Sequence, residues 1–157
     1  AYLWIAGEGP ERAELEKKAE VLGVKPRTRF LGWREDTPAL LASGDIFVCP
    51  SRHEPLGNVV IEAWAQAVPV IAADSYGPGT LIDNRETGIL VPINDAPTLA
   101  TAITNLLKDD KLLRRVARQG HQAFKKDFTE KIVVSRYMEF LKSIAPEAKP
   151  KPDAETP

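Results

Sequence analysis

The apolar residues of this chain fall in short unbroken runs that alternate with stretches of helical spacing. The stretch from Pro10 to Gly23 reads as a helix, with Leu15, Ala19 and Leu22 on one face. Unbroken apolar runs are typical of strands buried on both faces of a parallel sheet. The alternation therefore predicts an α/β fold, a Rossmann-like parallel sheet with helices on both faces. The runs that we expect to form strands are AYLWIAG, TRFLGW, DIFVCP, VPVIAAD and GILVPI.

Further helices are expected between and after these strands. TPALLAS reads as a short helix with Pro38 in its first turn, and another helix runs from about Asn58 to Gln66. Asp95 and Thr129 stand where helix caps are expected, on either side of a helix from about Asp110 to Lys126. The apolar residues at helical spacing in the last three helices are Leu99, Ala102, Ile103, Leu106 and Leu107; Leu113, Val116, Ala117 and Phe124; and Ile132, Val133, Tyr137, Phe140, Leu141 and Ile144.

Composition narrows the function classes. The net charge of -1 over 157 residues gives no electrostatic case for binding nucleic acid. We see no signal peptide and no apolar run long enough to cross a bilayer. The one cysteine, Cys49, lies in an apolar run, which predicts a buried reduced thiol and a cytoplasmic setting. We expect residues 1–145 to form one domain, and residues 146–157, rich in Pro and charge, to be a disordered tail.

The polar loops that follow the predicted strands indicate a nucleotide site, because ligands of such sheets bind outside the carboxyl ends of the strands. In the first loop, Gly7 and Gly9 resemble the start of a dinucleotide-binding fingerprint. The third glycine is missing and Pro10 removes an N–H donor, so a tight strand-to-helix turn is the favoured interpretation. The four loops are GEGP, GWRED, SRHEPLGN and SYGPG, the last of which also reads as a simple turn.

Two carboxylates frame the start of the central predicted helix. Pro55 and Gly57 predict a loop, so Glu54 would precede the helix and Glu62 would lie about one turn inside it. The free N–H groups and the dipole of the helix start suit an anion. This arrangement fits a ligand with a central negative charge and hydroxyl-rich groups on both sides. The alternative is that the carboxylates only complement the helix dipole, and His53 reads as a loop residue or a hydrogen-bond donor to substrate, with no second ligand for a metal.

Three segments of the sequence, read in order, resemble the C-terminal domain of glycosyltransferase family 4, which comprises retaining enzymes with the GT-B fold. The segments are IAGEGPERAELE, the long stretch from RFLGW to GTLI, and ETGILVPINDAPTLATAI, which together cover roughly the first hundred residues. The most specific element is Glu-X7-Glu, from Glu54 to Glu62, with PLGN inside it and PV after it.

The resemblance implies a role for each matching position. Glu62 would accept two hydrogen bonds from the ribose diol of the donor, and Glu54 would contact the transferred sugar. Trp33 and Arg34 would lie beside the base; for Arg34, a plain surface charge is the alternative. The positions that would hold the donor phosphates are Leu56, Gly57, Asn58 and Val59, and the loop at Gly7 and Gly9 completes the donor-binding set.

The resemblance also implies the chemistry and the partners. The parent enzyme would transfer a sugar from a UDP- or GDP-sugar to an acceptor hydroxyl with retention, and it would need no metal and no cofactor. The acceptor, a glycan or glycolipid, would bind to an N-terminal domain absent here, and peripheral membrane association of the full-length enzyme is compatible with this class. The alternatives are a GT-B sugar-nucleotide epimerase or phosphorylase, and a non-catalytic nucleotide-binding module.

Three departures from the family pattern stand out. Family members often have Gly where this chain has Ala67, which we interpret as a packing variation, and Glu where it has Thr80. The family's domain also begins with a further strand, followed by the Arg and Lys that bind the diphosphate. A Rossmann-like sheet runs 3-2-1-4-5-6, so without strand 1 the sheet would keep the order 3-2 and 4-5-6. We therefore expect a fragment with a gap between AYLWIAG and DIFVCPS, which exposes one edge of each strand. We expect a missing or separate segment to fill this gap; the alternatives are that the two strands close up or that the gap stays open.

Overall fold

A computed structural model describes residues 1–144, so the predicted tail at 146–157 lies outside the described residues. The chain divides into two compact units. We call Ala1–Ser43 the N-terminal unit and the residues from Gly44 onward the C-terminal unit, and each is described by itself. This division does not test whether residues 1–145 form a single domain, so the single domain stays a prediction.

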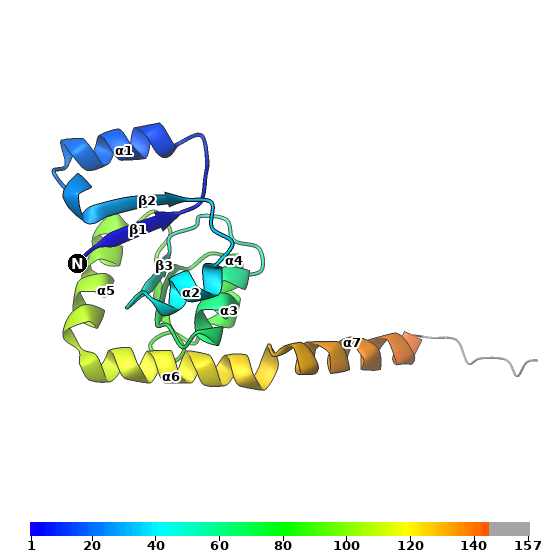
Figure 1. Cartoon of the computed structure of the whole chain (residues 1–157). Coiled ribbons are helices and arrows are strands. Elements are labelled where there is room, and N and C mark those ends of the chain that lie inside the picture. The colour runs from blue at the N-terminus through cyan, green and yellow to red at the C-terminus, as the bar shows by residue number, and fades with distance from the viewer. Residues whose placement is uncertain (145–157) are drawn as a thin grey trace, which may run out of the picture. The chain divides into compact units, whose positions relative to one another are not determined.

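The N-terminal unit is built around a pair of parallel strands (Figure 1). Leu3 stands opposite Thr28 and Ile5 opposite Phe30, and the register shifts before Ala6, which pairs with Gly32. The elements are β1 (Leu3–Ala6), α1 (Arg12–Val21), a 3₁₀ turn η1 (Lys25–Arg27), β2 (Thr28–Gly32) and α2 (Thr37–Ala42). The strands AYLWIAG and TRFLGW and the short helix at TPALLAS are thus confirmed.

The predicted apolar face of α1 is only partly covered. Ala19 is buried, but the side chains of Leu15 and Leu22 are 42% and 63% exposed. Leu15 and Leu22 therefore share a face with Ala19 but do not belong to a buried core. Their spacing is helical, and within this unit nothing covers them.

The C-terminal unit holds three parallel strands in the order β3-β4-β5. Phe47 pairs with Val70, and Ile71 pairs with Ile89, so β4 is hydrogen-bonded on both sides. The elements are β3 (Phe47–Cys49), α3 (Asn58–Ala65), β4 (Val70–Ala73), α4 (Tyr76–Leu81), β5 (Ile89–Val91), α5 (Ala96–Lys108), α6 (Asp110–Asp127) and α7 (Glu130–Ile144).

The observed pairing agrees with the strand order expected from the sequence. Within residues 1–144, β1 is paired with β2 alone and β3 with β4 alone. The two sheets therefore correspond to the expected orders 3-2 and 4-5-6. Each of the strands β1 and β3 has one edge that carries no ladder within the described part of the chain.

One part of the core of the C-terminal unit lies between its sheet and α5. Ile71, Val91 and Leu106 are buried together there. Asp95 begins α5 as predicted, because its carboxylate accepts a hydrogen bond from the Thr98 N–H at 2.9 Å. The spacing of Leu107 predicts a core position, and this prediction is wrong, since its side chain is 46% exposed. Cys49 is a buried free thiol, as expected.

Trp64 links α3 to the turn before β5 and to α6 in the same unit. Its ring is 1% exposed, and its Nε1–H donates to the Thr87 carbonyl at 2.9 Å. Its own carbonyl lies 2.9 Å from Nδ1 of His121 on α6. Gly120 lies directly against the indole, so a side chain there would collide with it. The other tryptophans, Trp4 and Trp33, are 46% and 76% exposed and belong to the N-terminal unit.

α7 buries none of its residues. Its apolar side chains are largely open to solvent, and the most exposed among them are Tyr137, Phe140 and Ile144, at 66%, 58% and 60%. Over residues 1–144, no helix is both long enough and apolar enough to cross a membrane.

Candidate functional site

The helix between the two carboxylates begins where the sequence predicts. Gly57 is the N-cap of α3, with φ of 75°, and Asn58 is the first helical residue. Most L-residues avoid this left-handed conformation, so glycine is required by the backbone. A Cβ at this position would also lie 2.7 Å from Cδ1 of Leu81. Glu54 therefore precedes the helix and Glu62 lies inside it, as expected.

Glu54 holds the loop in front of α3. Its Oε1 accepts a hydrogen bond from the N–H of Gly57 at 3.1 Å. Its backbone carbonyl accepts another from the N–H of Gly77 at 2.8 Å. The residue is half-buried. The sequence suggested a ligand contact for Glu54 but did not suggest this second task of fixing the loop.

Gly77 allows the SYGPG segment to touch this loop. A Cβ at Gly77 would lie 2.5 Å from the nitrogen of Gly57 and 2.6 Å from the carbonyl oxygen of Glu54. Since real Cβ atoms do not approach so closely, any larger residue would push the loop away. The segment forms the short helix α4, so its interpretation as a simple turn is wrong. The glycine at position 77, next to a proline, is the signal in the sequence for this close approach.

The start of α3 presents unused backbone donors. The first helical hydrogen bonds run from Val60 and Ile61 to the Gly57 carbonyl. In the part of the chain that the structure describes, the N–H groups of Asn58 and Val59 have no hydrogen-bond acceptor. Such free N–H groups at the positive end of the helix dipole favour an anion.

The side chains around these donors are accessible. Glu62, in the second turn of α3, is exposed, as is Asn58. Val59 is half-buried, and the Leu56 side chain is 69% exposed. His53 is also exposed in the preceding loop. The segment from Glu54 to Glu62 thus carries the two carboxylates on either side of the N–H groups of Asn58 and Val59.

The end of α3 explains one departure from the family pattern. Ala67 adopts φ of 56°, and the N–H groups of Ala67 and Val68 donate to the carbonyls of Trp64 and Ala63. These two bonds form the Schellman motif, in which the residue after the C-cap takes the left-handed conformation and is usually glycine. The interpretation of Ala67 as a packing variation is therefore wrong, because the backbone conformation makes glycine favourable there. Thr80, the other departure, donates to the Tyr76 carbonyl within α4.

The other candidate residues lie in the N-terminal unit. Gly7 has φ of 126°, and its N–H donates to the carbonyl of Gly32 at 2.7 Å, which ties the GEGP loop to the end of β2. Gly9 lies in the same loop, and nothing lies within 4 Å of the position of its missing Cβ. Gly32 itself has φ of 70°. It precedes Trp33, whose ring is 76% exposed.

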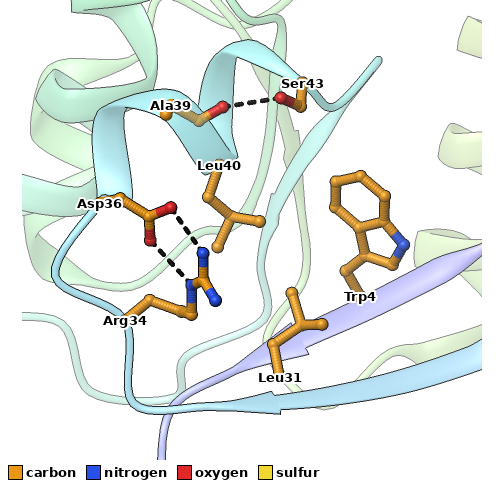
Figure 2. Close-up of a pocket in the computed structure, with 7 residues that line it drawn as sticks. All are labelled: Trp4, Leu31, Arg34, Asp36, Ala39, Leu40 and Ser43. Carbon is orange, nitrogen blue, oxygen red and sulfur yellow. Dashed lines mark hydrogen bonds and ion pairs between the residues drawn. The ribbon is translucent and has the colours of Figure 1, made fainter.

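Arg34 forms a two-pronged ion pair with Asp36. Its Nε lies 2.7 Å from Oδ1 and its Nη2 2.5 Å from Oδ2 of that carboxylate. These hydrogen bonds raise the pKa of Arg34 and lower the pKa of Asp36. The pair borders a hollow of about 270 Å³ (Figure 2), which is lined by Trp4, Leu31, Arg34, Asp36, Ala39, Leu40 and Ser43. The guanidinium of Arg34 is thus already engaged.

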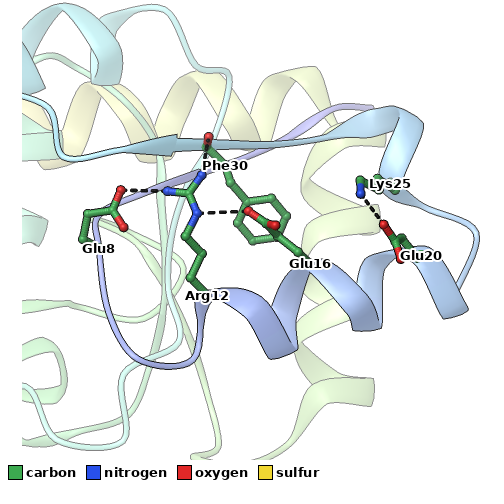
Figure 3. A network of polar contacts seen from close by, with 6 residues as sticks. All are labelled: Glu8, Arg12, Glu16, Glu20, Lys25 and Phe30. Atoms are coloured by element: carbon green, nitrogen blue, oxygen red, sulfur yellow. Dashed lines mark hydrogen bonds and ion pairs between the residues drawn. The ribbon is translucent and has the colours of Figure 1, made fainter.

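Arg12 fixes the other side of the GEGP loop (Figure 3). Its guanidinium contacts Oε1 of Glu8 at 2.7 Å and Oε1 of Glu16 at 3.0 Å. It also donates to the carbonyl of Phe30 on β2 at 3.5 Å. Arg12 therefore links the loop, α1 and β2, a role that the sequence did not suggest.

The comparison with known proteins identifies the family. The family described as glycosyl transferases group 1 matches residues 1–109. The chain belongs to this family. The expectation of a glycosyltransferase is thereby confirmed, and the comparisons do not favour the alternatives of a non-catalytic module, an epimerase or a phosphorylase.

Two curated relatives illustrate the similarity. The lipopolysaccharide core biosynthesis glycosyltransferase LpsE of Rhizobium meliloti is 43% identical over 142 residues, which make up 90% of this chain and 42% of the relative. The alpha-D-kanosaminyltransferase of Streptomyces kanamyceticus is 38% identical over 118 residues, 74% of this chain and 31% of the relative. The chain thus spans less than half the length of the relatives that it matches.

A solved structure shares the fold. Anabaena Alr3699/HepE, crystallised in complex with UDP, superposes with a TM-score of 0.87 at 27% identity, over 92% of this chain and 41% of that chain. The same protein is also known in complex with UDP-glucose. The predicted α/β fold of the GT-B type, with parallel strands and helices on both faces, is confirmed, and the chain corresponds to part of such a protein.

Proposed function

We propose that the whole protein carrying this chain is a retaining glycosyltransferase of family 4, and that this chain binds its nucleotide-sugar donor. One observation carries the proposal. The free N–H groups of Asn58 and Val59 lie between two carboxylates, Glu54 and Glu62, on one accessible segment. An anion at the helix start, with a polyol on each side, has the chemical layout of a nucleoside diphosphate sugar.

Each part of the donor has a matching group. The diphosphate accepts hydrogen bonds from the N–H groups at the start of α3, where the helix dipole also favours negative charge. Glu62 accepts hydrogen bonds from the ribose diol, and Glu54 orients the transferred sugar. Leu56, Gly57 and Val59 are the remaining positions proposed for the phosphates. From the family resemblance, and not from the placement of the two units, we also assign Trp33 and Arg34 to the base and include Gly7 and Gly9 in the donor-binding set. For Arg34 we propose a backbone contact, because Asp36 already engages its side chain.

The reaction that fits this layout breaks the bond between the sugar C1 and the phosphate oxygen. The acceptor oxygen then bonds to C1 on the same face. Its proton passes to the departing phosphate, so no protein base is required. The helix start stabilises the negative charge that develops on the leaving group.

UDP is the favoured nucleotide. Alr3699/HepE, which is 27% identical to this chain, was crystallised with UDP and with UDP-glucose. The acceptor is proposed to be a hydroxyl of a glycan or glycolipid, since the relatives of this chain include lipopolysaccharide core biosynthesis glycosyltransferases. Such an acceptor suits a cytoplasmic enzyme associated peripherally with a membrane, and the buried free thiol of Cys49 suits a reducing compartment.

The test of this function separates the two tasks of Glu54. Glu54→Gln keeps an oxygen for the Gly57 N–H and so keeps the loop, while it removes the charge near the sugar. Glu54→Ala removes both. In the whole protein we expect each variant to lower the rate of sugar transfer by on the order of 100-fold, the cost of poor orientation.

The comparison of the two variants assigns the loop-fixing task. UDP affinity, measured by calorimetry, should be unchanged in Glu54→Gln and weaker in Glu54→Ala, because only the second loosens the loop before α3. Normal transfer by both variants would show that Glu54 does not contact the transferred sugar.

A further inference from the structure

One side of α6 is strongly basic, and the donor site does not involve it. No Asp or Glu occurs between Lys111 and Lys126. At 100° per residue, the basic side chains of this stretch fall on an arc of about 120° and extend over about 22 Å. All of them are exposed, whereas Val116 and Gly120 on the opposite side are buried. We call this surface the α6 cationic face, and its members are Lys111, Arg114, Arg115, Arg118, Lys125 and Lys126.

Most of this charge is not neutralised within the described residues. Arg114 forms an ion pair with Asp110 at 2.9 Å. Arg115 donates to a neutral acceptor, the carbonyl of Arg85, at 3.2 Å. Along residues 1–144 no ion pair joins Lys111, Arg118 or the two C-terminal lysines of the face to a carboxylate. In a chain of net charge -1, such a cluster is a local excess of positive charge.

A hollow lies at the beginning of the α6 cationic face. It has a volume of about 250 Å³, and its lining includes the basic residues Arg85, Lys111 and Arg115, together with Leu112. The one carboxylate in the lining, Asp109, is occupied as the cap of α6, since it accepts from the Leu112 N–H at 2.9 Å. The hollow therefore suits a group the size and charge of a phosphate.

The hollow and the donor site lie at opposite edges of the sheet. Arg85 belongs to the turn that leads into β5, at the amino end of that strand. Glu54 belongs to the loop that leaves β3, at its carboxyl end. Because β3, β4 and β5 are parallel, the amino ends and the carboxyl ends form different edges. A donor bound at the start of α3 therefore leaves the hollow free.

We propose that the α6 cationic face binds a membrane surface rich in anionic phospholipid, with a lipid phosphate in the hollow. Lys and Arg side chains along one side of a helix fit a planar surface on which phosphates recur in every direction, and each such residue near an anionic bilayer adds to the attraction. Single-stranded nucleic acid would require aromatic side chains for base stacking, and the face has none. The inference rests on the peripheral membrane association proposed above and identifies the surface responsible for it.

The experiment compares two variants of the whole protein with the same change in charge. The first, Lys111→Gln/Arg115→Gln/Arg118→Gln, removes three cations from the face. The control, Lys17→Gln/Lys18→Gln/Arg27→Gln, removes three exposed cations from the N-terminal unit. Co-sedimentation is measured with phosphatidylcholine vesicles, with and without phosphatidylglycerol. Since each basic residue contributes on the order of fivefold, we expect the first variant to bind the anionic vesicles about 100-fold more weakly.

The wild type and the control should bind the anionic vesicles alike, release them at high salt, and ignore the neutral ones. The proposal would be overturned if both variants bound the anionic vesicles equally well. It would also be overturned if the wild type did not bind the anionic vesicles, or bound the neutral vesicles just as well. Tighter binding to a DNA oligonucleotide than to the anionic vesicles would overturn it in favour of nucleic acid. Calorimetry with UDP in the absence of lipid keeps the donor site separate, because the affinity for UDP should be the same in all three proteins.

Discussion

Ala67 is a residue whose conformation conflicts with its type. It occupies the left-handed position of the Schellman motif that ends α3, with φ of 56°. This conformation costs an L-residue roughly 1–2 kcal/mol, whereas glycine adopts it freely but loses about 0.4–1 kcal/mol through its greater freedom in the unfolded state. We therefore expect Ala67→Gly to raise the free energy of unfolding by about 0.5–1 kcal/mol in a urea titration.

The control for this substitution is Ala65→Gly, two residues earlier, at the last residue of α3. There the backbone is helical, so glycine should lower the free energy of unfolding by about 1 kcal/mol. If both substitutions destabilised the protein equally, position 67 would have no special backbone requirement.

Glu62 can be tested in the whole protein through nucleotide binding alone. Its carboxylate is exposed one turn inside α3, where the proposed ribose diol would donate to it. Glu62→Ala should weaken UDP binding by roughly 1.5–3 kcal/mol, the range for hydrogen bonds to a charged group. Glu62→Gln should weaken it less, since one acceptor oxygen remains. Calorimetry measures both, with the exposed Glu86→Ala as a control; equal affinity in Glu62→Ala and wild type would remove the ribose assignment.

The sequence alone could place these residues but could not give all of their contacts. The start of α3 was predictable because Pro55 and Gly57 restrict the backbone locally. The hydrogen bond from Gly77 to the Glu54 carbonyl was not, because it joins segments that are distant along the chain. The same holds for Arg12, whose partners on α1 are local but whose contact on β2 depends on the tertiary fold.

At the scale of elements, caps and apolar runs predicted most of the helices and strands, because both signals act over a few residues. The burial of individual faces was harder to predict. Leu15, Leu22 and Leu107 have the spacing of core residues, yet their side chains are exposed. Spacing shows which residues share a face, and only the tertiary arrangement shows whether another element covers that face.

The cap of α5 gives a prediction that depends on pH. The hydrogen bonds from Thr98 hold the pKa of Asp95 below its usual value of 3.8. The stabilisation by this carboxylate is therefore complete above pH 3.8 and is lost as the pH falls through the lowered pKa. We expect Asp95→Ala to have a lower Tm than wild type at neutral pH. The difference in Tm should shrink progressively as the pH is lowered below 3.8. A difference in Tm that stays constant across this range would show that the charge of Asp95 does not contribute.

At the scale of the whole molecule, this chain corresponds to a part of its relatives. It covers 42% of LpsE and 41% of Alr3699/HepE. From the family resemblance we propose that the acceptor site and the diphosphate-binding Arg and Lys lie outside residues 1–157. We therefore expect residues 1–157, expressed alone, to release no UDP from UDP-sugars above background. Turnover equal to that of the whole protein would contradict this expectation.

The strand order was predictable at this scale for a related reason. A Rossmann-like sheet has a fixed order, so the assignment of the five apolar runs to strands 2 to 6 predicts which of them pair. The pairs β1-β2 and β3-β4-β5 follow that order. The division of the chain after Ser43 was not predicted, because no Gly-rich or Pro-rich linker marks it in the sequence.

The unequal exposure of the three tryptophans has a spectroscopic consequence. Indole emission moves to longer wavelengths in contact with water, so Trp64 should emit in the blue, and Trp4 and Trp33 should emit further to the red. Because the buried indole belongs to one unit and both exposed ones to the other, the two ends of the emission band report on different parts of the chain. A single denaturant titration followed at both wavelengths would thus reveal whether the two units lose their structure together or one after the other.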